Sequence, residues 1–544
     1  MKRSPSSAAP QRGFVTLSVM VIILMITYAC YRFTTTAVEQ HRHAAARSDR
    51  LQLEFAADSA EALLLKVVAA PPAEAAAAPP NDRAAATPPV AERFAGVAVG
   101  GNPAAPRRAY FTVVSRRVAR EGGLELQYGP ACTSAQLSLS AVAEWERNQA
   151  GVGAAALAAL PGLDPLVAER IAQFLAGGAT IPSAPRTAVA PAGAPQTAAV
   201  AAPAGGASSR EAPVRPTNPA ATSGPVWRGV SVEELLAVPG VTHELLWGGD
   251  RNANGVVSSW EAAVSRDSPG EGRGGTTGGG AAPLGAYLTP YSAERNVNRW
   301  RQPRVYLNQP DLAALEAALG PRLPRPWVEF IMAYRRYGPS AGSRAAHAAA
   351  ARYAIDSIYD LIGAEVAIPL TEGKTQLLRS PCAADRSSLR EHLLPLADEV
   401  TVDPRPVIPG RIDVNTAPRE VLRTIPGADE TLVERILGAR ETPLSAAGPQ
   451  RYHAAWLAAE GWTEPAWMRI LEPYVTAGGD VHAAQIAAFF APGEADERRP
   501  VARGEDLGVR REVVLDAARE LPCVVLRRDL SNLGLGYARE ALIP

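Results

Sequence analysis

The pattern of apolar and polar residues divides the chain most sharply at its N-terminus. Residues 14–31 read FVTLSVMVIILMITYACY and carry no charged side chain. As a helix rising about 1.5 Å per residue, this run nearly crosses a hydrocarbon core of about 30 Å. Residues 34–68 contain no Gly or Pro and place Leu51 and Phe55 at helical spacing among charged residues. The pattern predicts one continuous helix over residues 14–68, apolar in its first half and amphipathic in its second.

Segments of strand character follow this helix and recur near the C-terminus. Residues 109–118 and 124–128 are rich in β-branched and aromatic residues, and Gly122 and Gly123 lie between them as in a hairpin. Residues 472–490 and the later segments REVVLDA and PCVVLRRDL have the same character. We expect a small sheet that packs on the second half of the long helix.

A Pro-Gly turn between two apolar segments recurs three times. The segments are LAALPGLDPLVAERIAQFL at 157–175, LLAVPGVTHELLWG at 235–248 and VLRTIPGADETLVERILGAR at 421–440. Each predicts two short helices joined by a tight turn, the helix-hairpin-helix arrangement, with the second helix capped by Asp or Thr. The turn residues are Pro161, Gly162, Pro239, Gly240, Pro426 and Gly427.

The chemistry of these turns does not favour nucleic acid as a partner. DNA-binding versions have a second Gly two residues after the first, so that backbone N–H groups face a phosphate. Here these positions hold Asp164, Thr242 and Asp429, and a carboxylate repels DNA. The 55 Lys and Arg of the 544-residue chain balance 55 Asp and Glu, whereas nucleic-acid-binding domains are usually basic. We therefore interpret the three units as protein-packing modules.

Composition adds linkers and excludes several kinds of site. The 46 Gly and 48 Pro together make up a larger share of the 544 residues than the average of about 12%. They gather in Ala/Pro-rich or Gly-rich stretches, which we interpret as linkers. The four cysteines form no C-x-x-C pair, which excludes a zinc or redox motif, and pairing of Cys382 with Cys523 stays open. Because the sequence has no nucleotide-binding glycine loop, H-E-x-x-H or G-x-S-x-G motif, we expect no enzymatic activity.

Residues 250–261, DRNANGVVSSWE, match the calcium loop D-x-N-x-N-G-x₅-E at every defined position. The predicted ligands are the side chains of Asp250, Asn252, Asn254 and Glu261, the carbonyl of Val256 and a water held by Ser258, with Gly255 at the sharp turn. Two charged ligands indicate a weak affinity suited to millimolar calcium. The sequence therefore predicts calcium as a cofactor, and the alternative is an Asn/Gly-rich surface turn.

The N-terminal layout resembles the type IV pilin and pseudopilin family. Basic residues without an acid precede Gly13, and Phe14 begins the predicted helix. In that family a prepilin peptidase cleaves after the Gly and the next residue is N-methylated, so the resemblance assigns cleavage to Gly13 and methylation to Phe14. Major members carry Glu at the fifth mature position, which is Ser18 here. The resemblance associates this loss with a subunit at the tip of a fibre.

A second resemblance covers residues 410–441, GRIDVNTAPREVLRTIPGADETLVERILGARE. They are similar to the I-N-V-N-T-A-P-x-x-V-L-x-x-L-P-G motif of the general secretion pathway protein K family, the large minor pseudopilins of type II secretion. Residues 412–414 predict a strand, and Asn415 or Thr416 is expected to cap the helix that Pro418 opens. YLTPYSAERNV at 287–297 also resembles this family. The family inserts a helical domain between the first strands and the rest of a pilin fold.

These observations predict an α+β fold: a pilin-like long N-terminal helix with a small antiparallel sheet, plus an inserted α-helical domain with helix-hairpin-helix (SAM-like) units. The resemblance implies a minor pseudopilin at the tip of the type II secretion pseudopilus. It would span the inner membrane once, with its C-terminal bulk in the periplasm. Its implied partners are other minor pseudopilins, the inner membrane and the prepilin peptidase. Two alternatives stay open: a DNA-binding, competence-type minor pilin, and a membrane-anchored calcium-binding scaffold.

The chain divides into a series of predicted segments. They are a prepilin leader at 1–13, a transmembrane half-helix at 14–33, an amphipathic stem at 34–68, an Ala/Pro linker at 69–106, the first strands at 107–145, a helix-hairpin-helix unit at 152–178, a Pro/Ala linker at 179–225, a second unit with the calcium-type loop at 226–268, a Gly-rich linker at 269–282, a helical protein-K-like domain at 283–441 and C-terminal strands at 442–544.

Overall fold

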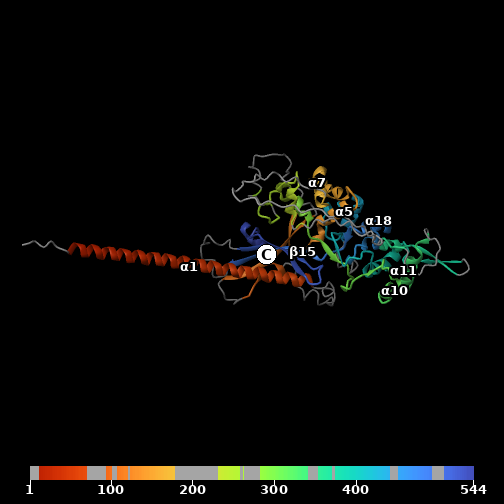
Figure 1. Ribbon diagram of the computed structural model, residues 1–544, viewed down its shortest axis with the longest axis horizontal. Coiled ribbons are helices and arrows are strands. Elements are labelled where there is room, and N and C mark those ends of the chain that lie inside the picture. The colour runs from red at the N-terminus through yellow and green to blue at the C-terminus, as the bar shows by residue number, and fades with distance from the viewer. Residues whose placement is uncertain are drawn as a thin grey trace, which may run out of the picture.

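The fold is a mixed α+β arrangement in which one long helix projects from a body of sheet and short helices (Figure 1). The computed structural model describes residues 12–69, 93–100, 107–119, 123–177, 229, 231–255, 257, 261, 282–340, 353–370, 374–441, 451–492 and 508–543. The predicted linker at 179–225 lies outside these residues, and so does the predicted linker at 269–282 except for Ala282, which is buried.

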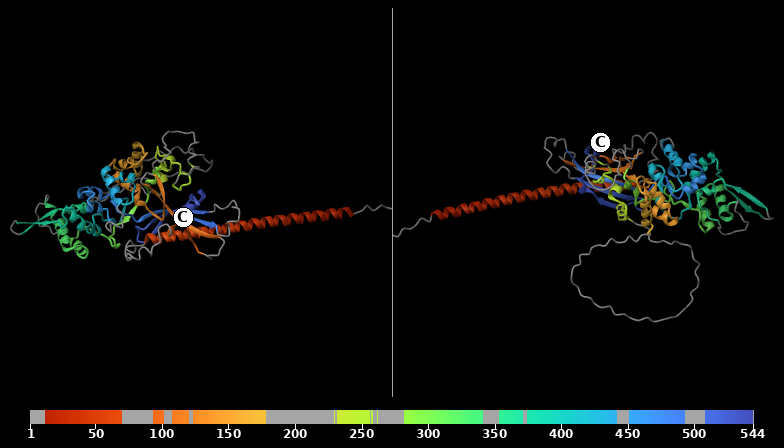
Figure 2. Two further views of the ribbon diagram at one scale, coloured as in Figure 1. Left: turned by 180° about the vertical axis from the view of Figure 1, so that it is seen from behind. Right: turned by 90° about the horizontal axis from the view of Figure 1, so that it is seen from above.

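Helix α1 (Arg12–Ala69) confirms the predicted continuous helix. Its 58 residues correspond to a length of about 90 Å at the usual rise. The first half extends away from the body, and the second half lies along the sheet (Figures 1 and 2). The absence of Gly and Pro after the apolar run allows the helix to continue without a break.

The main sheet is antiparallel, and it combines strands from two distant parts of the chain. Its order is β1-β2-β15-β16-β17, with β3 paired to β2 and β4 paired to β15. The strands are β1 (Val97–Ala98), β2 (Arg107–Val118), β3 (Leu124–Tyr128), β4 (Ala131–Cys132), β15 (Val481–Pro492), β16 (Gly508–Asp516) and β17 (Cys523–Asp529). Strand β15 lies between β2 and β16, so the helical body is an insertion within one sheet.

The second half of α1 packs on one face of this sheet. Its buried positions, Leu53, Ala57, Ala60 and Leu64, follow one another at intervals of four, three and four residues, as one helical face requires. They share a core with Phe111 and other apolar residues of β2, β15 and β16. The small Ala side chains allow the helix to approach the sheet closely, and each fully buried Leu contributes about 1.5–3 kcal/mol.

Ion pairs fix this helix along its flank. Glu61 accepts a hydrogen bond from Arg527 Nε at 3.0 Å, and Asp58 pairs with Arg511. Because both arginines belong to the two C-terminal strands, the pairs connect the first element of the chain to the last strands of the sheet.

The inserted body consists of short elements around its own core. Its α-helices are α5 (Leu139–Asn148), α6 (Val152–Ala158), α7 (Pro165–Leu175), α8 (His243–Trp247), α10 (Leu312–Leu319), α11 (Arg325–Tyr337), α12 (Arg386–Ser388), α13 (Leu394–Glu399), α14 (Arg419–Leu422), α15 (Glu430–Arg440), α17 (Trp456–Ala459) and α18 (Pro465–Leu471). Single turns are η1 (Thr133–Ala135), η2 (Val232–Ala237), η3 (Leu284–Ala286) and η5 (Ile358–Leu361), and η7 (Leu389–Leu393) is a π-helix. After the sheet come η9 (Ser531–Leu533) and α19 (Arg539–Leu542).

Pairs of short strands join these helices. They are β5 (Leu137–Ser138) with β6 (Leu288–Thr289), β7 (Ala293–Arg295) with β12 (Val407–Pro409), β8 (Val305–Tyr306) with β11 (Val400–Thr401), β9 (Glu365–Pro369) with β10 (Thr375–Arg379), and β13 (Ile412–Asp413) with β14 (Val475–Thr476). The strand predicted at 412–414 is present as Ile412–Asp413, one residue shorter, and it pairs in parallel with β14.

One expectation about the motif that follows this strand is wrong. Neither Asn415 nor Thr416 caps α14, whose first turn has no side-chain cap. Instead, Asn415 Nδ2 donates to the carbonyls of Arg451 at 3.0 Å and Ala477 at 2.8 Å. Thr416 bonds the buried carboxyl of Asp413, whose pKa is raised by burial although this hydrogen bond opposes the rise. The polar side chains of this motif therefore bond to other segments of the body and do not cap the adjacent helix.

Two segment predictions also need correction. The stretch 69–106 was expected to be a linker outside any core, but Phe94 is 3% exposed and packs in the core between α1 and the sheet, directly before β1. An Ala/Pro-rich composition does not prevent one aromatic side chain from anchoring a short strand. The stretch 107–145 was expected to hold strands, but it also contains most of α5, whose apolar face is buried in the body.

Candidate functional site

The predicted cleavage site lies at the start of α1. Gly13 and Phe14 fall in its first turn, while the side chains before Leu17 and the leader before Arg12 lie outside the described residues. Ser18, the position without Glu, lies on α1 with intermediate exposure.

The first half of α1 has the properties of a single membrane anchor. Its most apolar 18-residue window has a mean hydropathy of 1.7, and none of that window is buried against the rest of the protein. Large apolar side chains such as Met20 and Leu24 are 70% and 71% exposed. By length and composition this helix can cross a membrane once.

The stem also keeps an apolar surface of its own beside the body. Phe55 is 66% exposed and Leu51 is 47% exposed, although both lie next to residues of α1 that the sheet buries. An aromatic side chain exposed to this extent leaves a large apolar area in water. This part of the α1 surface is therefore apolar and exposed.

The loop at 250–255 curls around two buried carboxylates. Asp250 is 6% exposed, and its two carboxylate oxygens accept the N–H groups of Asn254 at 3.1 Å and Gly255 at 2.7 Å. Glu261 is fully buried, and its Oε1 accepts the N–H groups of Arg251 at 3.0 Å and Asn252 at 3.1 Å. The loop thus brings together the first and last predicted calcium ligands.

The remaining predicted ligands are placed in part. Asn252 and Asn254 lie between the two carboxylates in the chain, and Asn252 Oδ1 accepts the N–H of Asn254 at 3.0 Å. Val256 and Ser258 lie outside the described residues. Within the described part of the chain, no three His, Cys, Asp or Glu side chains gather as a metal cluster. An ion here would depend on amide and carbonyl oxygens beside two carboxylates, a donor set that suits calcium.

The backbone of the loop meets the conformational demand that the sequence implied. Gly255 has φ of 82°, in the left-handed region, and a Cβ at this position would lie 2.1 Å from Arg116 Cδ. Ala253 has φ of 56°, which is uncommon for a residue with a side chain. Its carbonyl accepts a hydrogen bond from Gln485 Nε2 at 2.9 Å. Contacts with the sheet therefore accompany this strained turn.

The second face of the sheet supplies these contacts, which sequence reasoning missed. Arg510 on β16 is fully buried and donates to the carbonyls of Asn252 and, at 3.4 Å, Gly534. Burial lowers the pKa of Arg510, while Tyr537 and Asp250 oppose the shift. No local signal could have found this residue, because its partner in the loop is 258 positions away in the sequence.

The three Pro-Gly turns each lie between two short helical segments. As expected, the second segment of each is capped by a side chain: Asp164 accepts the N–H of Leu166 at 2.8 Å, and Asp429 accepts that of Leu432 at 2.7 Å. Thr242 caps α8 in the same way.

Two of the turns lie beside side chains of neighbouring helices, although Gly240 and Gly427 remain exposed. A Cβ on Gly240 would lie 2.9 Å from a methyl group of Val167 on α7, and Arg170 donates to the carbonyl of Pro239 at 3.2 Å. A Cβ on Gly427 would lie 3.2 Å from Ile470 on α18. The turns of the second and third units therefore each have a contact with a neighbouring helix.

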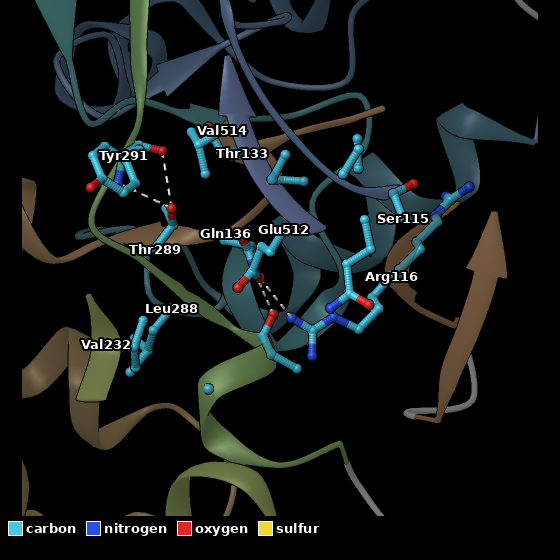
Figure 3. A pocket seen from close by; sticks show the side chains of 18 of the residues that line it. Ser115, Arg116, Thr133, Gln136, Val232, Leu288, Thr289, Tyr291, Glu512 and Val514 are labelled. Atoms are coloured by element: carbon cyan, nitrogen blue, oxygen red, sulfur yellow. Dashed lines mark hydrogen bonds and ion pairs between the residues drawn. The ribbon is translucent and has the colours of Figure 1, made fainter. Parts of the chain in front are cut away.

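A cavity of about 660 Å³ separates part of the sheet's second face from the inserted body (Figure 3). Its walls combine apolar residues such as Leu288 and Val514 with charged ones. Glu512 lies 3.4 Å from Arg116, and Glu233 lies 2.6 Å from Arg528. Since these charged wall residues pair with one another, we assign the cavity no ligand.

The four cysteines are free, so no disulfide bond joins Cys382 to Cys523. Cys382 is buried in the inserted body, and burial raises the pKa of its thiol.

No protein-family model matches the chain, and neither a curated protein sequence nor a solved structure matches it.

Proposed function

We propose that the chain is a minor pseudopilin at the tip of the type II secretion pseudopilus and takes part in protein secretion by assembling with other minor pseudopilins. The observation that carries the proposal is the continuity of α1. An exposed apolar half follows Gly13 and Phe14, and a second half packs on an antiparallel sheet. The interruption of that sheet by a helical insertion supports the pilin-like and protein-K-like interpretation. The role is assembly, not catalysis.

The mechanism follows from the two halves of the helix. The apolar half holds the subunit in the inner membrane, with the body in the periplasm, until assembly extracts it. The stem then packs among the helices of neighbouring subunits, and the exposed side chains of Leu51 and Phe55 supply apolar area for that contact. Prepilin peptidase would act first, after Gly13.

Two features support a position at the tip. Ser18 replaces the Glu that, in major members of the family, pairs with the N-terminal charge of a neighbouring subunit. The wide inserted body lies at the end of α1 opposite the membrane half (Figure 1). A subunit that lacks the pairing carboxylate and carries so large a body ends the fibre.

Within this proposal the helix-hairpin-helix units serve as packing modules of the body. The contact between Arg170 and the carbonyl of Pro239 joins the first unit to the second. In the third unit, Arg419 and Arg423 pair with Glu430 at 2.9 Å and 2.8 Å. Cations that are neutralised in this way contribute little to DNA binding, and for this reason we do not favour the DNA-uptake alternative.

We further propose that calcium binds the loop at 250–261 through Asp250, Asn252, Asn254 and Glu261. The support is the full match of residues 250–261 to the calcium-loop pattern, together with the placement of the Asp250 and Glu261 carboxylates against the backbone of one turn. Calcium would neutralise both carboxylates and supply no chemistry beyond this structural role.

Calorimetric titration of calcium into the full chain in detergent tests this site. We expect one ion with a dissociation constant of about 10⁻⁴–10⁻³ M, because only two ligands are charged. Asp250→Ala should abolish the heat of calcium binding. Asp356→Ala is the control: it removes a carboxylate that is 78% exposed and lies shortly before η5, and it should leave the heat unchanged. Equal heats from Asp250→Ala and the wild type would remove the site.

The pseudopilin assignment is tested by the N-terminus of the mature protein, because the alternative of a membrane-anchored calcium-binding scaffold retains its leader.

A further inference from the structure

Strand β17 ends the main sheet and leaves one side of its backbone without a partner strand. In the described part of the chain it pairs with β16 alone, and no other backbone–backbone hydrogen bond reaches residues 523–529. A bulge lies beside Val514 and Leu515, and the register with β16 is regular from Leu526 to Asp529. An open edge of this kind presents N–H and C=O groups with which a further strand can pair. The sheet can therefore be extended on this side.

The backbone groups of Arg527 lie on the open side of β17. The N–H of Leu530 donates to the carbonyl of Arg510 at 2.8 Å, so residue 530 faces β16. In an antiparallel pair, residues whose backbone groups face the neighbouring strand alternate with residues whose groups face away. Leu526 and Arg528 therefore also face β16, while the N–H and C=O of Arg527 point toward the position of a further strand.

The charged side chains of β17 do not close this edge. Arg527 Nε donates to Glu61 of α1 at 3.0 Å, on the face of the sheet that the long helix covers. Arg528 lies on the opposite face, 2.6 Å from Glu233 of η2. Charged side chains protect an edge strand by extending over it, whereas these two are held above and below the sheet. Because the chain itself neutralises both arginines, the edge favours an uncharged strand as its partner.

The edge adjoins the exposed apolar surface of the stem. Leu51 and Asp58 are seven positions apart in α1, so they lie on the same flank of the helix. Asp58 pairs with Arg511 of β16, and this flank therefore faces the C-terminal strands. Phe55 lies one helical turn from Leu51 and is also exposed. A protein that contacts these two apolar side chains is thus brought beside β17.

The size of the apolar surface on α1 shows that a further surface takes part. An aromatic side chain buries about 150–250 Å², whereas a stable interface buries about 800 Å² on each partner. Leu51 and Phe55 alone fall well short of this area. Leu521, which is 79% exposed and lies two residues before β17, adds apolar area at the other end of the edge. The stem, the edge of β17 and Leu521 together form one continuous surface.

We infer that a neighbouring minor pseudopilin adds a strand to the main sheet at β17 while its helix packs on Leu51 and Phe55. The inference rests on the assembly role proposed above, and it names the surface that performs this role. The added strand lies about 4.8 Å from β17 and pairs with the outward backbone groups of Arg527. Because backbone hydrogen bonds supply the contact, the partner segment is extended and uncharged.

Hydrogen exchange of the full chain in detergent, alone and with the purified minor pseudopilins of the same secretion system, tests the added strand. The amides of β17 that face away from β16 become hydrogen-bonded only in the complex. Peptides within residues 523–529 should exchange about tenfold more slowly at a partner concentration ten times the dissociation constant. Peptides of β10, which pairs with β9 alone in the described part of the chain, should not change. This control distinguishes strand addition from stabilisation of the whole protein.

Arg527→Pro and Arg527→Ala form a matched pair of variants. Both lose the ion pair with Glu61, but only proline also loses the outward N–H, and an edge strand tolerates proline where its N–H faces away from the sheet. The loss of one backbone hydrogen bond should weaken copurification of the minor pseudopilins about two- to tenfold in Arg527→Pro relative to Arg527→Ala. Exchange of the amides of β15 verifies that the sheet of each variant is folded.

The possible outcomes separate this inference from the proposed function. A complex that forms without slower exchange at residues 523–529 would refute the added strand and leave the pseudopilin proposal standing. Equal copurification of Arg527→Pro and Arg527→Ala would also refute it. Slower exchange in the chain alone that increases with its own concentration would identify a second copy as the occupant and overturn the assignment to a minor pseudopilin. A mature protein that keeps its leader and forms no complex would refute the proposed function together with the inference.

Discussion

Replacing Gly13 with leucine should leave residues 1–13 on the protein and prevent its entry into the pseudopilus. A peptidase that accepts glycine before the cut bond has no space for a branched side chain, so processing should be almost completely lost. The retained basic leader would also hold the N-terminus on the cytoplasmic side of the membrane. We expect an unprocessed chain on mass spectrometry and loss of secretion in a strain that has no other copy.

Ser18→Ala is the matched control, because it changes a side chain of α1 beyond the cleaved bond and should leave processing intact. A Gly13→Leu chain that still loses its leader would show that cleavage does not depend on this glycine. The assignment of the peptidase site would then be wrong.

Leu64→Ala should destabilise the packing of α1 on the sheet by about 2–5 kcal/mol, because the side chain is fully buried and its removal leaves a cavity. Phe55→Ala should change stability by about 0.5 kcal/mol or less, because that ring is 66% exposed. Its expected effect is on assembly, as weaker copurification with the other minor pseudopilins. The two substitutions therefore separate folding of the subunit from packing between subunits.

Since the sheet and the inserted body have separate cores, hydrogen exchange of amides in β2 and β15 is the appropriate stability measurement. Unchanged protection in Leu64→Ala would contradict the described packing. Normal copurification of Phe55→Ala would remove Phe55 from the proposed contact between subunits.

The sequence predicted the elements whose signals are local. The long helix followed from an uncharged run and the absence of Gly and Pro, and the hairpin of β2 and β3 followed from segments rich in β-branched and aromatic residues on both sides of Gly122 and Gly123. The caps Asp164 and Asp429 followed from their places after the Pro-Gly turns. In each case neighbouring residues alone determine the outcome.

Predictions failed where contacts between residues far apart in the sequence determine the structure. The Ala/Pro-rich stretch was predicted to be a linker, but its residue Phe94 packs in the core between α1 and the sheet. Asn415 is of a residue type that often caps helices, but its side chain donates to the carbonyls of Arg451 and Ala477 instead. The loop at 250–255 was recognised from its own pattern, whereas its attachment to Arg510 depends on a fold that brings together residues far apart in sequence.

The mass of the N-terminal peptide of the mature protein tests the central claim most directly. The account predicts a chain that begins at Phe14 with a methylated α-amino group. A mature protein that retains residues 1–13, or one cut beyond the apolar run of α1, would contradict the pseudopilin assignment.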